Sequence, residues 1–201
     1  MAPKRLSPIS NPSMLIWENN DDINYIQCLN NRSVIQQHLD ACREERRPYI
    51  FVTNTMREIV QLNRILVPVT MLEEEVYKAE ICSYLARKTG AHLILMKAHD
   101  YGSHAQQNIN RIITHLKSVA EKSGTPISYE VIDAYKNSFK LYKEAVERQT
   151  ETGHQLLILT ASREYGLDDI LFGPPERHAI QRSQVPVMLI NPRSDLFSLC
   201  D

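Results

Sequence analysis

Residues 156–175 combine a short apolar strand, a loop and the expected start of a helix, an arrangement that can bind the phosphates of a nucleotide. In such sites the backbone N–H groups at the beginning of the helix point at the phosphates, and glycines let the backbone approach them closely. Most of the residues that would form this cradle are replaced here. The segment therefore predicts a nucleotide-binding architecture in which the binding is altered or lost.

Three other groups of residues have side chains suited to chemistry: His99 with Asp100 and His104, the pair Asp168–Asp169, and the run 73–75 of three glutamates. A metal site needs three or more converging ligands, so we expect the histidines to be solvated in a helix-capping loop. Without a phosphate site to share a Mg²⁺ ion, the aspartates predict a solvated acidic turn. The glutamates are suited to the positive end of a helix.

No nucleophile, base or carboxylate pair has the spacing of a catalytic site, so we predict that the protein is not an enzyme and binds no metal. The formal net charge is −1, which predicts no attraction to nucleic acid. Residues 1–8 carry positive charge with no apolar segment behind them, so we expect no secretion signal, and no apolar run is long enough to cross a bilayer. We therefore expect the protein in the cytoplasm. Its four cysteines form no CxxC pair and are expected to be free thiols.

The elements that must position these residues alternate regularly between strand and helix. The expected strands are residues 64–70, 92–97, 127–132, 155–160 and 186–191, and the expected helices are residues 73–89, 103–122, 138–152 and 175–183. This order predicts an α/β fold: an open, doubly wound parallel sheet of five strands with helices on both faces. The third strand alternates most and should lie near an edge. Ligands of such sheets bind beyond the carboxyl ends of the strands, where Thr70, His99 and the loop after Thr160 are expected.

The N-terminal part resembles the end of the chain and adds a βαβ-like extension. Residues 14–17 parallel 156–159, residues 31–46 have helical periodicity, and residues 48–53 parallel 186–191. One interpretation is the remnant second half of a module, and the other is that any βαβ unit has this pattern. The predicted divisions are an extension at residues 1–60, the main domain at 61–193 and a tail at 194–201.

Taken together, the apolar strand at residues 65–69, the strand at 156–159, the loop ending at Gly173 and the strand at 185–190 resemble the universal stress protein family. The resemblance covers about residues 64–193 and rests on the order and spacing of all four segments. It implies an adenine nucleotide alpha hydrolase-like sheet and pairing through the last strands, as dimers or tandem pseudo-dimers. One branch of the family binds ATP, and another does not.

The resemblance also implies where a nucleotide would bind. The binding branch has an aspartate after the first strand and a Gly-x2-Gly-x9-Gly-Ser/Thr pattern at the phosphates and ribose. In this sequence the aspartate position is Thr70, the first two glycine positions are Thr160 and Arg163, the third is retained as Gly173, and the Ser/Thr position is Pro174.

These departures predict little or no ATP binding in the family's usual mode. Thr70 has no ionised acceptor for the base, Thr160 and Arg163 add side chains where the backbone must approach the phosphates, and Pro174 and Pro175 lack amide donors. Each lost hydrogen bond to a charged group costs about 1.5–3 kcal/mol. Arg163 could instead bind an anion through its guanidinium, or pair with the aspartates at residues 168 and 169; we favour the pairing.

Two functions follow from this resemblance. The first is a non-enzymatic, stress-associated interaction protein with a degenerate nucleotide site and no cofactor. The second is a sensor that binds ATP, another adenine nucleotide or a small anion weakly, through Arg163, Gly173 and Thr70. Under the first, residues 48–53 pair antiparallel with residues 186–191, either within one chain as a pseudo-dimer or alongside homodimer formation.

Overall fold

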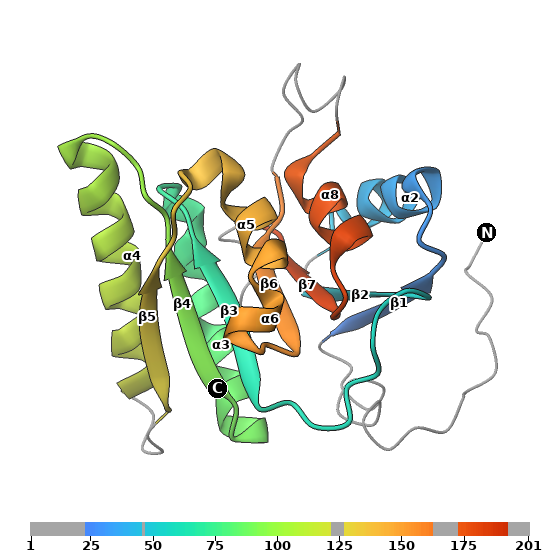
Figure 1. Ribbon diagram of the computed structural model, residues 1–201, viewed down its shortest axis with the longest axis horizontal. Helices are drawn as coiled ribbons and strands as arrows, with labels where there is room; N and C mark the ends of the chain where they lie inside the picture. The colour runs from blue at the N-terminus through green and yellow to red at the C-terminus, as the bar shows by residue number, and fades with distance from the viewer. Residues whose placement is uncertain (1–22, 46, 122–126, 163–172, 193–201) are drawn as a thin grey trace.

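One seven-stranded sheet organises the chain, in the strand order β1-β2-β7-β6-β3-β4-β5 (Figure 1). The structure is a computed structural model, and it describes residues 23–45, 47–121, 127–162 and 173–192. The strands are β1 (Asn24–Cys28), β2 (Tyr49–Thr53), β3 (Arg64–Val69), β4 (His92–Lys97), β5 (Tyr129–Asp133), β6 (Leu156–Thr160) and β7 (Val187–Ile190).

Helices cover both faces of this sheet (Figure 1). They are α2 (Arg32–Cys42), the 3₁₀ helix η1 (Glu73–Tyr77), α3 (Lys78–Thr89), α4 (Ser103–Glu121), the 3₁₀ helix η2 (Ser138–Lys140), α5 (Leu141–Glu147), α6 (Gln149–Thr152) and α8 (Pro175–Arg182). Helix α3 packs against α4, whereas α8 packs against α5 and α2. The core therefore has two apolar layers, one on each side of the strands.

The five strands from β3 to β7 pair in parallel, which confirms the predicted doubly wound sheet. Every residue of β6 and β7 is buried, as their uninterrupted apolar sequences predict for strands covered on both faces. Strand β5 lies at one edge and is only half-buried, which agrees with its alternating sequence. Strands β3 and β6 are neighbours at the centre of this module, and they pair near their amino ends, Ile65 with Leu156 and Leu66 with Leu157.

The N-terminal segment extends the same sheet through an antiparallel contact. Strand β2 pairs with β7, with Ile50 opposite Met188 and Phe51 opposite Val187. The predicted pairing of residues 48–53 with residues 186–191 is thus confirmed. The N-terminal strand expected at residues 14–17 lies outside the described residues, and the strand that pairs with β2 is β1, which the sequence analysis did not assign. Strand β1 is only partly apolar and only partly buried, which agrees with its position at the edge of the sheet that the structure describes.

In the residues that the structure describes, the unit β1-α2-β2 has the same form as β6-α8-β7: two parallel strands with a helix between them in sequence. Their helices pack against each other, and Nη1 of Arg177 on α8 donates to Oε1 of Gln36 on α2 at 2.9 Å. This arrangement agrees with the half-module interpretation. The division at residue 60 stays a prediction, because residues on both sides of it share one core.

Several helix boundaries differ from those that the sequence periodicity predicted. The helix expected at residues 73–89 begins as the 3₁₀ helix η1, and the one expected at 138–152 is divided into η2, α5 and α6. The break between α5 and α6 falls at Arg148, whose backbone leaves the helical conformation. Helix α2 begins after Asn31, whose side chain accepts from the N–H groups of Ser33 and Val34, and it ends at Cys42.

Candidate functional site

The expected nucleotide position lies where β3 and β6 end. Thr70 follows β3, and Thr160 is the last residue of β6. Because these strands are parallel neighbours, their carboxyl ends bring the two threonines to the same edge of the sheet. Both side chains are buried, with exposed fractions of 4% for Thr70 and 6% for Thr160.

A carboxylate of the chain itself lies between these threonines. The Thr70 hydroxyl donates to Oε1 of Glu75 at 2.7 Å, and the Thr160 hydroxyl donates to Oε2 of Glu75 at 3.3 Å. Glu75 comes from η1, the helix that follows the Thr70 loop, and it is fully buried. Both strand ends therefore contact one internal acceptor.

The buried charge of Glu75 is compensated by Lys78, which is also fully buried. The Lys78 ammonium forms an ion pair with Oε2 of Glu75 and donates to the backbone carbonyl of Pro68 in β3. Removing one partner of such a pair leaves an uncompensated charge in the interior, at a cost of about 3–5 kcal/mol. The pair is therefore a fixed part of the strand ends.

Tyr142 of α5 forms hydrogen bonds with the backbone of Thr160, the last residue of β6. Its hydroxyl donates to the carbonyl of Thr160 at 3.0 Å and accepts from the Thr160 N–H at 3.2 Å. Burial raises the pKa of Tyr142 well above its ordinary value, and the charges of Glu75 and Glu176 raise it further. The hydroxyl stays protonated and can keep donating.

The first residues of the loop after β6 also bind a carboxylate. The Ser162 N–H donates to Oε1 of Glu176 at 3.0 Å, and the Ser162 hydroxyl donates to Oε2 at 3.0 Å. Glu176 lies in the first turn of α8 and is only 2% exposed. A negative charge thus already lies at the helix start where a phosphate would have to bind.

Gly173, the retained glycine of the family pattern, makes room for an arginine. Its φ is +86°, and a Cβ added there would lie 1.5 Å from Nη2 of Arg177. The guanidinium fills the space beside the Gly173 Cα. Pro174 precedes α8 as its N-cap and provides no side-chain cap, and Pro175 is the first helical residue. The loop residue Arg163 and the aspartates at 168 and 169 lie outside the described residues.

The structure thus joins Thr70 and Thr160 through Glu75 and places Gly173 and Pro174 at the start of α8 beside Arg177. Sequence reasoning did not predict the buried polar contacts of Glu75, Lys78, Tyr142, Glu176 and Arg177. Glu75 was expected at a helix start and lies in the first turn of η1, but its burial and its bonds to both threonines were not predicted. One signal was available, since Glu75 and Lys78 share the buried helix face with Ala79 and Cys82 at helical spacing.

Asp100 and its neighbouring histidines do not converge. Asp100 is 8% exposed, and both carboxylate oxygens accept from the Ser138 N–H at 3.2 Å. The ring of His99 instead makes an edge contact with Tyr101, with centroids 5.5 Å apart, and His104 is exposed on α4. Within the described ranges, no group of three or more His, Cys, Asp or Glu residues could hold a metal ion.

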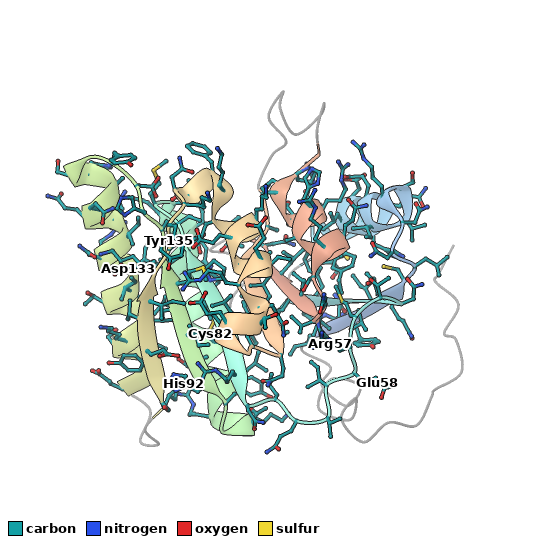
Figure 2. All side chains as sticks on the ribbon, in the orientation of Figure 1. Arg57, Glu58, Cys82, His92, Asp133 and Tyr135 are labelled. Atoms are coloured by element: carbon teal, nitrogen blue, oxygen red, sulfur yellow. The ribbon has the colours of Figure 1, made fainter. Side chains whose placement is uncertain are left out.

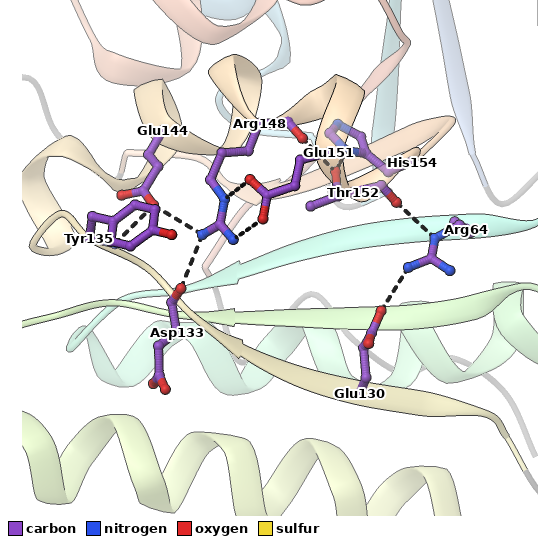
Figure 3. A network of polar contacts seen from close by, with 9 residues as sticks. All are labelled: Arg64, Glu130, Asp133, Tyr135, Glu144, Arg148, Glu151, Thr152 and His154. Atoms are coloured by element: carbon purple, nitrogen blue, oxygen red, sulfur yellow. Dashed lines mark hydrogen bonds and ion pairs between the residues drawn. The ribbon is translucent and has the colours of Figure 1, made fainter.

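A second polar network holds α5 and α6 against the sheet (Figure 3). The Glu144 carboxylate accepts from the N–H groups of Tyr135 at 2.9 Å and Lys136 at 2.7 Å, and from Nη1 of Arg148 at 3.1 Å. The same Arg148 nitrogen donates to the carbonyl of Asp133 at 3.0 Å. This network fixes the turn after β5 and has the character of a structural support.

His154 lies at the far end of this network, just before β6, and is 1% exposed (Figure 3). Its Nδ1 is 2.7 Å from the Thr152 hydroxyl. Burial lowers the pKa of His154 to about 4. The imidazole is therefore neutral at physiological pH.

Comparison with known proteins supports the fold. No protein-family model and no curated protein matches the sequence. Among solved structures, a universal stress protein from Archaeoglobus fulgidus superimposes with a TM-score of 0.60 at 14% identity, and the match covers 87% of this chain and 62% of that chain. A universal stress protein solved in complex with cAMP has a TM-score of 0.51 at 14% identity, covering 66% of this chain and 99% of that chain.

The chain thus has the universal stress protein fold, as the sequence resemblance predicted, and at these identities the likeness concerns the fold alone. It spans 62% of the length of the Archaeoglobus fulgidus protein. Of the helices that the structure describes, none has the length and apolar character required to span a membrane.

Proposed function

We propose that this chain is a cytoplasmic, non-enzymatic interaction protein of the stress response, built on the universal stress protein fold and with a degenerate nucleotide site. One observation carries the proposal: the Glu75 carboxylate, neutralised by Lys78, binds both Thr70 and Thr160 at the ends of β3 and β6. The chain's own side chains occupy the groups that a nucleotide would have to contact.

The energetic cost of exchanging these contacts for a ligand is high. A nucleotide bound at the strand ends would have to displace Glu75 and leave Lys78 buried without its counter-charge, at about 3–5 kcal/mol. Its phosphates would also approach the buried carboxylate of Glu176. Since about 1.4 kcal/mol corresponds to a tenfold change in affinity, these costs remove micromolar binding.

Isothermal titration of the full chain with ATP, in the presence of Mg²⁺, tests this proposal. We expect no saturable heat with ATP, ADP or cAMP, the last because it is bound in one solved structure of this fold. A dissociation constant below about 10 μM for any of them would contradict the proposal. The variant Arg163→Ala distinguishes this proposal from the sensor alternative. If the protein is a sensor, the variant should lose nucleotide binding; under the present proposal, its titration should equal that of the unmodified chain.

We further propose that β2 serves as an internal substitute for a partner subunit. The resemblance implies that universal stress proteins pair through their last strands, and here the edge of β7 is occupied by β2 of the same chain. Asn191, just after β7, reinforces this contact: it accepts from the Tyr49 hydroxyl at 3.1 Å and donates to the carbonyls of Cys42 at 2.8 Å and Glu45 at 2.9 Å. Partner binding would then use another surface.

A further inference from the structure

Four large apolar side chains are exposed at the carboxyl ends of β3, β4 and β5. They are Leu72, 53% exposed, Tyr101, 87% exposed, Tyr135, 78% exposed, and Phe139, 80% exposed. We call this group the aromatic rim. Figure 2 shows Tyr135 at the carboxyl end of β5, and His92 at the opposite end of the sheet. Exposed aromatic residues in one place are typical of binding surfaces.

Ser138 links the three loops that carry Leu72, Tyr101 and Phe139. Its hydroxyl accepts from the Met71 N–H at 2.9 Å and donates to the Asp100 carboxylate. Met71 precedes Leu72, Asp100 precedes Tyr101, and Ser138 precedes Phe139. Each exposed side chain is therefore one residue away from the same hydrogen-bonded centre, although the three come from different loops.

The backbone of the aromatic rim is held in place before any partner arrives. The His99 N–H donates to the carbonyl of Lys136 at 2.8 Å, which joins the loops after β4 and β5. The N–H groups of Tyr135 and Lys136 are bound by Glu144. The Arg148 guanidinium lies 5.0 Å from the centre of the Tyr135 ring. Binding would thus require little additional ordering of the chain.

Around the aromatic rim positive charges are exposed, and beneath it negative charges are buried. Lys136 and Lys140, which neighbour Tyr135 and Phe139 in sequence, are exposed, and within the described residues neither forms an ion pair. Two carboxylates beneath the rim, those of Asp100 and Glu144, are buried and bonded internally.

Two exposed acidic residues lie nearby in sequence, and neither neutralises these lysines. Glu73 pairs with Arg111 at 3.0 Å. The Asp133 side chain points away from Tyr135 in Figure 3. The surface at Tyr135 and Phe139 therefore presents apolar side chains together with positive charge.

We propose that the aromatic rim, with Lys136 and Lys140, is a docking site for an acidic peptide segment of a partner protein that also carries apolar side chains. This deepens the proposed function, on which it rests, by naming the surface and the chemistry of the partner. Apolar side chains of the segment would pack on Tyr135 and Phe139, and its carboxylates would face the two lysines. A nucleic acid fits less well, because backbone recognition requires a longer track of basic residues on a more basic protein.

Nuclear magnetic resonance of the ¹⁵N-labelled full chain tests this proposal. The probe is a short synthetic peptide of alternating Glu and Leu with one Phe, compared with the same peptide carrying Lys in place of Glu. We expect the acidic peptide to shift the amide signals of residues 72, 101 and 135–140, with a dissociation constant below about 1 mM that weakens as salt is added.

Paired variants identify the groups responsible. Tyr135→Ala with Phe139→Ala, and separately Lys136→Glu with Lys140→Glu, should each weaken binding at least about tenfold. Val60→Ala is the matched control, because Val60 is 85% exposed in the connection between β2 and β3. The affinity of this variant for the acidic peptide should equal that of the unmodified chain. All of these side chains are exposed, so the variants should fold.

Several results would overturn the proposal: no shifts with the acidic peptide, shifts confined to other surfaces, or equal losses in Val60→Ala. Equal or tighter binding of the Lys peptide or of a uridine oligonucleotide would also overturn it, as would rim shifts that depend on protein concentration alone, which would indicate a second copy. None of these outcomes resembles a failure of the proposed function, which would instead appear as tight ATP binding with shifts at Thr160 and Ser162.

Discussion

Thr70 and Thr160 retain hydroxyl groups at the strand ends, but the acceptor for both is Glu75 rather than a ligand. The one hydroxyl proton of each threonine is donated to Glu75 in the folded state, so the two threonines join β3 to β6 through this carboxylate. Lys78 makes this possible, because an isolated carboxylate at 0% exposure would be too costly to keep ionised.

Gly173→Ala should destabilise the protein more than an alanine at another glycine with positive φ. Gly102, with a φ of +98° and no heavy atom within 4 Å of an added Cβ, is the matched control. Gly102→Ala bears only the left-handed backbone cost of about 1–2 kcal/mol. Gly173→Ala should cost about 1–3 kcal/mol more, because it also displaces Arg177 from its bond to Gln36. Urea unfolding measures both, and equal losses would contradict the packing role of Arg177.

His154 should make the free energy of unfolding depend on pH. Burial lowers its pKa from 6.5 to about 4 in the folded state, so between these values the unfolded chain binds more protons. Stability is then complete above pH 6.5 and falls as the pH drops toward 4, by up to about 3 kcal/mol for this group. Urea titrations at a series of pH values measure the slope.

The control for this experiment is His115→Gln, because His115 is exposed on α4. His154→Gln should flatten the slope between pH 4 and 6.5, whereas His115→Gln should leave it unchanged. If both variants keep the slope of the unmodified chain, the acid sensitivity arises elsewhere.

At the scale of elements, Asn191 is expected to hold the unit β1-α2-β2 against β7. Asn191→Ala removes the partner of the Tyr49 hydroxyl and of the Cys42 and Glu45 carbonyls. We expect a loss of about 1–3 kcal/mol, and faster hydrogen exchange in α2 and β2 than in β4. Asn110→Ala, at an exposed position of α4, is the control. Uniformly faster exchange in Asn191→Ala would mean that the N-terminal unit does not open separately.

The element order was predictable because each buried strand is a short apolar run bounded by turns, and each long helix has a continuous apolar face. The predicted strands at residues 64–70 and 186–191 agree with β3 and β7 to within a residue or two. Strand β1 was not predictable in the same way, since Asn24 and Gln27 interrupt its apolar pattern. Its position depends on pairing with β2, which is a tertiary contact.

For the candidate site, the sequence predicted which strand ends form it but not the carboxylates that bind there. The topology fixes Thr70 and Thr160 at one edge, and this much follows from strand order alone. The interaction with Glu75 depends on how η1 turns after Thr70, and that turn depends on packing against α3 and α4. The contact between Glu176 and Ser162 likewise depends on where α8 packs on the sheet. Local helix propensity does not determine that position.

For the whole molecule, we predict that the full chain does not form a dimer through β7. The edge of β7 that faces away from β6 is taken by β2, which pairs with residues 187–189 where a second copy would have to pair. Sedimentation velocity should show a monomer at micromolar concentrations. A stable dimer whose contact is weakened by a substitution at Met188 would contradict this expectation, while a dimer insensitive to that change would have to use another surface.

The seam between β2 and β7 also constrains when this sheet can close. Among the described elements, β1, α2 and β2 leave the ribosome before the others, and β7 is the last strand to emerge. Until then the inner edge of β2, with Ile50 and Phe51, has no strand beside it and is open to wrong pairing. The loop between β2 and β7 is long, and its conformational entropy must be lost before the two strands pair, so this step is slow. We therefore expect that, of the described units, β1-α2-β2 gains most from chaperone protection during synthesis, because it precedes the strand that completes it.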